Sequence, residues 1–115
     1  MTTKVMRIIR IAKDFSETPG PRARDEGDFS GDEFLQDILR PAYLLAVQEG
    51  TTLTVDLDGT EGYATSFLEA TFGGLAREFD AAEIDRVITF KSDDEPFLVN
   101  EIKGYIADAR NALKK

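Results

Sequence analysis

The stretch LTVDLDGTEGYATSFLEATFGGLAREF, residues 53–79, decides the fold that we expect for this chain. Residues 52–57 alternate between apolar and polar side chains, as in a half-buried β-strand with Leu53, Val55 and Leu57 on one side. The segment DGTEG at 58–62 has the composition of a turn. An apolar stripe at helical spacing follows, made of Leu68, Phe72, Leu75, Ala76 and Phe79. The stretch therefore predicts a strand, a turn and a helix in succession.

The helix in this stretch carries two further signals. Ser66 and Glu69 are spaced as in a capping box, so we expect Ser66 to cap the first turn. Gly73 and Gly74 lie inside the helix, where two glycines cost on the order of 2 kcal/mol relative to alanine. Such a cost indicates that the backbone must be bare there, and we expect close packing of this helix on a sheet.

Two segments near the N-terminus predict further strands. Residues 4–12, KVMRIIRIA, are rich in β-branched side chains and favour a strand, although the spacing of their basic residues leaves a helix open. Residues 16–29 contain two prolines and two glycines and predict a loop. A short strand at 22–24 would interrupt that loop.

The segment after this loop predicts a long helix. Ser30 and Glu33 form a capping box at its start, and Gly50 is placed to end it in a left-handed conformation. Pro41 lies inside the helix and lacks the amide hydrogen that would bond to the Asp37 carbonyl. We therefore expect a kink or a break at that position.

The C-terminal third repeats the alternation of strand and helix. Residues 87–90 predict a strand, and SDDEP at 92–96 is a strong helix start with proline early in the first turn. Lys114 and Lys115 suit the negative end of that helix. Its buried face would hold Leu98, Ile102, Tyr105, Ile106, Ala109 and Leu113. We expect one domain over residues 1–115, an α/β sandwich with right-handed crossovers.

The composition excludes several kinds of chemistry. The chain has 115 residues, 42% of them hydrophobic and 31% charged, which is typical of one globular domain. It contains no cysteine, so disulfides, thiolate nucleophiles and thiolate metal sites are excluded. It also contains no histidine, the commonest catalytic base and transition-metal ligand. We expect no metal, no cofactor and no catalytic residue.

The charge distribution argues against nucleic acid and membranes as partners. The net charge is −8, and an acidic surface repels phosphate backbones. Lys4, Arg7, Arg10 and Lys13 form a basic N-terminal exception, which we interpret as a solvated edge or a partner for the acidic body. The apolar runs are shorter than the ~20 residues of a membrane span, and the chain shows no secretory leader. We expect a cytoplasmic protein.

The pattern of residues resembles a known family. A strand ending in Asp-Leu-Asp, followed by a hydroxyl pair that opens a helix, resembles the STAS domain of anti-sigma-factor antagonists. The match is closer to small bacterial STAS-like proteins with no assigned biochemical role, and covers about residues 4–92. The residues that carry it are Arg22, Gly27, Ser30-Gly31, Phe34, Leu39, Pro41, Leu57-Asp58-Gly59, Gly62-Tyr63, Ser66-Phe67-Leu68-Glu69, Phe72-Gly73-Gly74-Leu75 and Arg77. It implies a mixed β-sheet of about four strands packed against three or four helices, and a non-enzymatic regulatory role.

The resemblance also implies a site. In STAS antagonists, a partner kinase with a histidine-kinase-like ATPase fold phosphorylates a serine at the start of the helix after the central strand. Alignment on Leu68 places Thr65 on that position and Ser66 beside it. Tyr63 and Phe67 would anchor the partner, with core packing as their alternative role, and Asp58 is a further docking candidate. For Ser66, simple helix capping is the alternative.

Two other classes of function remain open. The segment Thr54–Thr60 matches the nucleophile motif of haloacid-dehalogenase-like phosphatases, in which Asp56 would attack phosphorus, Asp58 would handle the proton and Mg²⁺ would bridge them. That fold places a lysine and an acidic pair after further strands, whereas here Lys91, Asp93 and Asp94 fall in one short run. The other class is a structural domain whose helix faces serve oligomerisation only.

Overall fold

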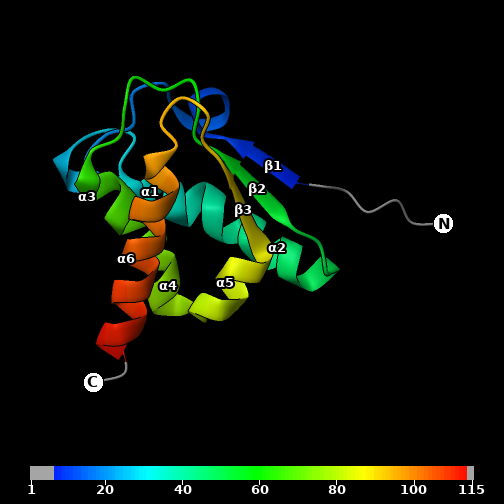
Figure 1. Ribbon diagram of the computed structural model, residues 1–115. Coiled ribbons are helices and arrows are strands. Elements are labelled where there is room, and N and C mark those ends of the chain that lie inside the picture. The colour runs from blue at the N-terminus through cyan, green and yellow to red at the C-terminus, as the bar shows by residue number, and fades with distance from the viewer. Residues whose placement is uncertain (1–6, 114–115) are drawn as a thin grey trace.

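The structure is a computed structural model that describes residues 7–113, with side chains to residue 111. Its sheet has three parallel strands within that range, in the order β1-β2-β3: β1 (Arg7–Arg10), β2 (Leu53–Asp56) and β3 (Ile88–Lys91) (Figure 1). The expected α/β class is confirmed, but the expectation of a mixed sheet with about four strands is wrong. Helical crossovers join successive strands, which makes the strands parallel. The segment expected as a fourth strand forms a short 3-10 helix, Arg24–Glu26.

The first strand is shorter than the sequence predicts. Residues 4–6, including Lys4, lie outside the described residues, as do Lys114 and Lys115. β1 ends at Arg10 because Ile11–Phe15 coils into a π-helical turn, η1. The Asp14 carboxylate accepts a hydrogen bond from the Arg10 amide at 2.8 Å, which holds this turn against the end of the strand.

The sheet has one buried face and one open face. Val55 in β2 is paired with Ile9 in β1 and Phe90 in β3, and this row lies in the core. The next row, Ile8, Thr54 and Thr89, points the other way; Ile8 and Thr89 are exposed and Thr54 is partly exposed. Parallel sheets are usually covered on both faces. Here the helices bury only one.

The helix predicted after Ser30 spans residues 31–49 in three pieces: α1 (Gly31–Phe34), a π-helical segment η3 (Leu35–Leu39) and α2 (Arg40–Glu49). Ser30 Oγ accepts from the Glu33 amide at 3.0 Å, and Gly50 ends the helix at a left-handed φ of 66°. The helix does not break at Pro41. The Arg40 amide donates to the Leu35 carbonyl, five residues earlier, which is the hydrogen bond of a π-helical turn. This wider turn lets the helix continue although Pro41 has no amide hydrogen to donate.

The helix of the deciding stretch spans residues 65–78, as α3 (Thr65–Leu68), η4 (Glu69–Gly73) and α4 (Gly74–Glu78). It begins two residues earlier than the capping box predicts, at Thr65 instead of Phe67. Ala64 is the N-cap residue and no side chain caps this end, so the predicted cap by Ser66 is wrong. Ser66 is already the second residue of the helix, and Glu69, the other half of the predicted box, pairs with two arginines.

The two glycines in this helix face another helix rather than the sheet. A Cβ on Gly74 would lie 2.7 Å from Leu35 Cδ2, in the helix 31–49. A Cβ on Gly31 would lie 2.6 Å from the Phe67 carbonyl oxygen, in the helix 65–78. The expected close packing is present, but its partner is the neighbouring helix. These contacts fix how closely the two long helices approach.

The last part of the chain contains a helix that the sequence pattern did not indicate. This helix, α5 (Ala81–Val87), runs directly into β3, which therefore starts at Ile88 instead of Val87. The C-terminal helix α6 (Phe97–Leu113) packs against η4 and α4. Its buried residues match the predicted face: Leu98, Ile102, Ile106 and Ala109, with Tyr105 partly buried. Within residues 7–113, no helix is long and apolar enough to cross a membrane.

Candidate functional site

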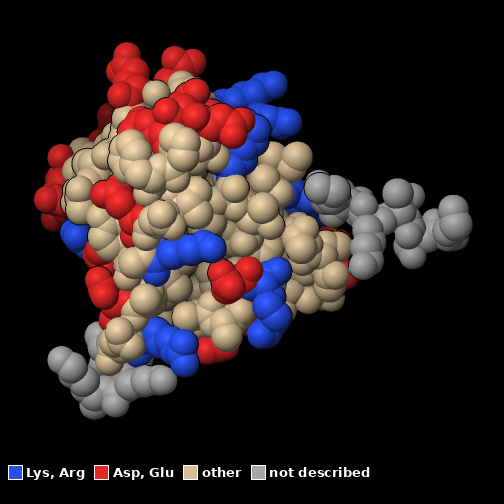
Figure 2. All heavy atoms as spheres, viewed as in Figure 1, with Lys and Arg blue, Asp and Glu red and all other residues tan. Residues whose placement is uncertain are grey.

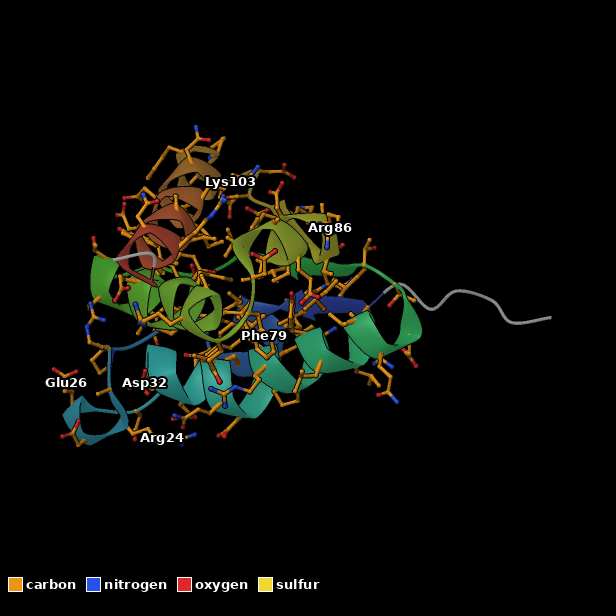
Figure 3. All side chains as sticks on the ribbon, turned by 90° about the horizontal axis from the view of Figure 1, so that it is seen from below. Arg24, Glu26, Asp32, Phe79, Arg86 and Lys103 are labelled. Carbon is orange, nitrogen blue, oxygen red and sulfur yellow. The ribbon has the colours of Figure 1, made fainter. Side chains whose placement is uncertain are left out.

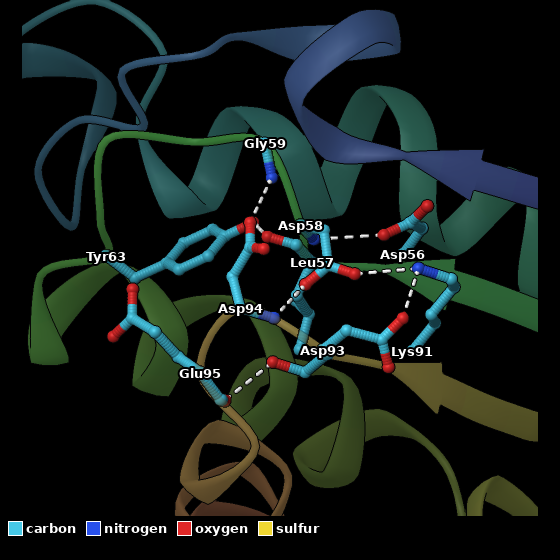
Figure 4. Close-up of polar contacts among 10 residues, drawn as sticks. Asp56, Leu57, Asp58, Gly59, Tyr63, Lys91, Asp93, Asp94 and Glu95 are labelled. Carbon is cyan, nitrogen blue, oxygen red and sulfur yellow. Dashed lines mark hydrogen bonds and ion pairs between the residues drawn. The ribbon is translucent and has the colours of Figure 1, made fainter.

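The loops that follow β2 and β3 meet at the carboxyl edge of the sheet (Figure 4). Asp58 connects them, because its carboxylate accepts from Lys91 Nζ at 2.7 Å and from the Asp94 amide at 2.9 Å. The connection is reciprocal, since the Gly59 amide donates to the Asp94 carboxylate at 3.0 Å. These contacts hold the residues before α3 in one position.

Charge in this cluster shifts the pKa of two groups. The hydrogen bond from Lys91, helped by the Asp94 amide, holds the pKa of Asp58 below its usual value. The carboxylates of Asp58 and Asp93 raise the pKa of Lys91, and Asp93 lies 2.9 Å from its ammonium group. Asp58 is therefore an ionised, internally paired carboxylate, and its side chain is only 16% exposed.

The geometry gives the two aspartates of the phosphatase-like motif internal partners. Asp56 Oδ1 accepts from the Asp58 amide at 2.9 Å, which closes the turn after β2. Both oxygens of Asp58 already accept from Lys91 and Asp94. Within the described part of the chain, no three acidic side chains are grouped so that they could hold a metal ion. The phosphatase hypothesis stays a prediction, testable by phosphatase turnover that disappears in Asp56→Asn.

Tyr63 and Phe67 lie side by side but differ in exposure. Phe67 is fully buried among the core aromatic rings, so it packs the interior and does not reach the surface. Tyr63 is partly exposed, its ring centroid 5.9 Å from that of Phe67, and its hydroxyl donates to the Leu57 carbonyl at 2.7 Å. Burial raises the pKa of Tyr63 to about 12. Its ring is therefore fixed at the surface by a neutral hydroxyl.

Thr65 and Ser66 occupy the first two positions of α3. Thr65 is exposed and Ser66 partly exposed, and neither caps the helix. Since β2 is the middle strand, the chain leaves the centre of the sheet and presents hydroxyl groups where the next helix begins. Residues 63–66 are called the α3 start below.

One cluster near the α3 start was missed by sequence reasoning. Glu69 accepts from Arg22 and, at 2.7 Å, from Arg77. Burial alone would raise the pKa of Glu69, but the hydrogen bonds from these two arginines outweigh it and lower the pKa. Gly73 lies beneath the pair, since a Cβ there would collide with the Glu69 carboxylate. Arg22 and Glu69 are 47 positions apart, so their pairing had no local signal in the sequence.

These observations define a class: a small α/β domain with helices on one face of a parallel sheet and exposed hydroxyl groups at the helix after its central strand. The chain belongs to the family described as STAS-like domain of unknown function (DUF4325), whose match covers residues 30–97. The resemblance seen in the sequence is thereby confirmed. Comparison with curated proteins and with solved structures found no match.

Proposed function

We propose that this STAS-like domain is a non-enzymatic regulatory module that binds a protein partner through the α3 start. Phosphorylation of Thr65 or Ser66 by a histidine-kinase-like ATPase modulates this binding, which places the domain in the cytoplasm with that enzyme and its ATP. The observation that carries the proposal is the exposed hydroxyl of Thr65 at the first position of α3.

The local electrostatics favour a phosphate at this point more than the sequence indicates. A phosphate adds about −1.5 to −2 charge at pH 7, and a helix N-terminus stabilises such charge by roughly 0.3–1 kcal/mol. Glu69 lies one turn further along the helix and would oppose the phosphate, but Arg22 and Arg77 neutralise it. Glu61 is then the remaining acidic residue close in sequence to the phosphate position. It is exposed and lies in the turn before α3.

The shape of the α3 start suits a docking surface. Ala64 and Thr65 are exposed and small, so a partner backbone can approach the helix end closely. Tyr63 adds a partly exposed ring held in place by its bond to the Leu57 carbonyl. Tyrosine is one of the residue types enriched at the energetic centres of protein interfaces. A partner that covers this surface would remove water from the phosphate, which costs free energy of desolvation. Each 1.4 kcal/mol of that cost lowers the affinity for the partner about tenfold.

The test uses the histidine-kinase-like ATPases of the organism that makes this protein, each purified and mixed with the domain in turn. We expect the protein to co-elute with one of them, and incubation with ATP to add the mass of one phosphate group by intact mass spectrometry. Thr65→Ala or Ser66→Ala should remove the addition, depending on which hydroxyl accepts it. Thr52→Ala is the matched control, because Thr52 is an exposed threonine at the opposite end of β2. Neither co-elution nor a mass change would refute the proposal.

A further inference from the structure

A hollow of about 380 Å³ lies between α5 and α6, far in sequence from the α3 start. Its floor is apolar and consists of Ile84, Phe90 and Ile106. Its walls are low because the residues on both helices are small: Ala81 and Ala82 on α5 and Ala107 on α6. Volumes of roughly 300–1,000 Å³ with apolar linings are typical of small-molecule pockets.

The rim of this hollow is cationic although the protein is acidic. Lys103 (Figure 3) and Arg110 line the hollow from α6 and lie two turns apart. Asp85 lines the hollow from α5. Figure 2 shows basic side chains over α5 and α6, whereas acidic ones gather over the loops at the other end of the molecule. With a net charge of −8, the bulk charge of the chain repels anions, so an anion would need such a local rim.

The two cations of the rim are not equivalent. Lys103 Nζ lies 3.9 Å from Asp85 Oδ1, a long, exposed ion pair that offsets its charge only in part. Among residues 7–113, no carboxylate lies within ion-pair distance of Arg110. A guanidinium group binds a carboxylate through two parallel hydrogen bonds. Lys103, Arg110 and Asp85 together give the rim a net charge of +1, which one negative charge on a ligand would balance.

We propose that this hollow binds a small monocarboxylate with an apolar body. The apolar part lies on Ile84, Phe90 and Ile106, and the carboxylate pairs with Arg110. This site is separate from the α3 start, and it holds whether or not a partner binds there.

The test titrates octanoate into the protein and follows backbone amide shifts by NMR. We expect saturable shifts confined to α5, Phe90 and α6, and much weaker binding of the neutral probe octanol. Arg110→Gln should weaken octanoate about tenfold, the loss of one charge-assisted pair worth ~1.4 kcal/mol. Arg86→Gln is the matched control, because Arg86 is an exposed arginine of α5 that does not line the hollow (Figure 3).

A second pair of variants tests the hollow itself. Ala107→Leu and Ala82→Leu add a side chain from opposite walls at exposed helix positions, so the fold should persist and octanoate binding should disappear. Circular dichroism checks that both variants are folded. Unchanged binding in these variants, equal binding of octanol, or equal weakening by Arg86→Gln would each overturn the proposal.

Discussion

A single missing side chain sets the distance between the two long helices. Gly31 faces the Phe67 carbonyl, and a Cβ at that glycine would stand 2.6 Å from the oxygen, so backbone would have to move. We predict that Gly31→Ala lowers the free energy of unfolding by about 1–3 kcal/mol, the usual cost of overpacking. Urea denaturation measures the change.

The matched control is a glycine in open space. Gly104 lies inside α6, and a Cβ there would meet nothing within 4 Å. Gly104→Ala should therefore raise the free energy of unfolding by roughly 0.5–1 kcal/mol, because alanine favours the helix. Equal effects of the two substitutions would show that the helix crossing is looser than described.

Tyr63 gives a second prediction at this scale. Tyr63→Phe removes the hydroxyl that bonds to the Leu57 carbonyl, and should cost about 0.5–1.5 kcal/mol in urea denaturation at pH 7. The folded-state pKa of about 12 lies above the ordinary value of 10.0, so this group stabilises the fold below pH 10 and loses that effect as pH rises through 12. The variant should therefore lose less stability than the wild type over that range. Parallel loss would contradict the assignment.

Sequence reasoning succeeded at residues whose role is local. Ser30 and Gly50 need only their own turn to act as caps, and both do so as expected. Ser66 carries the same local signal but caps nothing, because the helix already begins at Thr65 with Ala64 as its N-cap residue. Tyr43 gave no signal at all, yet its ring is fully buried and its hydroxyl donates to Glu83 at 2.6 Å.

At the scale of elements, the helices 31–49 and 65–78 each contain a π-helical segment, whereas α6 is a continuous α-helix. In the helix 31–49 this segment compensates for Pro41, and the helix continues. In the helix 65–78 it begins at Glu69, the residue that the two arginines engage. The spacing of apolar residues predicted both helices. It also led us to expect a kink or a break at Pro41, where the structure instead has the wider π-helical turn Leu35–Leu39. Helix α5 was missed because it has only seven residues and runs without a break into the β-branched strand.

The Arg22–Glu69–Arg77 cluster makes a prediction about how the loop 16–29 is held. Arg22 is the link, and the amides of Gly31 and Asp32 bond to the Pro21 and Arg22 carbonyls at 2.8 and 3.0 Å. Glu69→Gln should therefore speed hydrogen exchange at these two amides by about two- to tenfold, as expected for loss of exposed ion pairs.

The control for this prediction lies on the same helix. Glu78 pairs with Arg40 rather than with the loop, so Glu78→Gln should leave the two amides unchanged. The pKa of Glu69 is lowered in the folded state, so its contribution is present above the ordinary glutamate pKa and fades as pH falls through the lowered value. A difference between wild type and Glu69→Gln that persists in strong acid would contradict the ion-pair explanation.

At the scale of the molecule, all three strands deliver their carboxyl ends to one edge, where acidic loops gather (Figure 2). The α/β class and the alternation of the three strands with the helices 31–49, 65–78 and α6 were predictable from the sequence, whereas α5 was not. The absence of a fourth strand within residues 7–113 was not predictable from Arg22 to Arg24, because Arg24 pairs with Asp37 of another element. The place of Thr65 on the surface was predictable, because it depends only on the turn after the central strand.

The central claim is that the α3 start is the surface a partner binds, and one affinity measurement tests it. Thr65→Glu places a negative charge at an exposed helix N-terminus, where it stabilises the helix by roughly 0.3–1 kcal/mol. Any loss of binding therefore does not come from unfolding. We predict that this variant binds the ATPase found by co-elution at least tenfold more weakly than the wild type by calorimetry, whereas Thr52→Glu binds like the wild type. Equal affinity of the wild type and Thr65→Glu would contradict the claim.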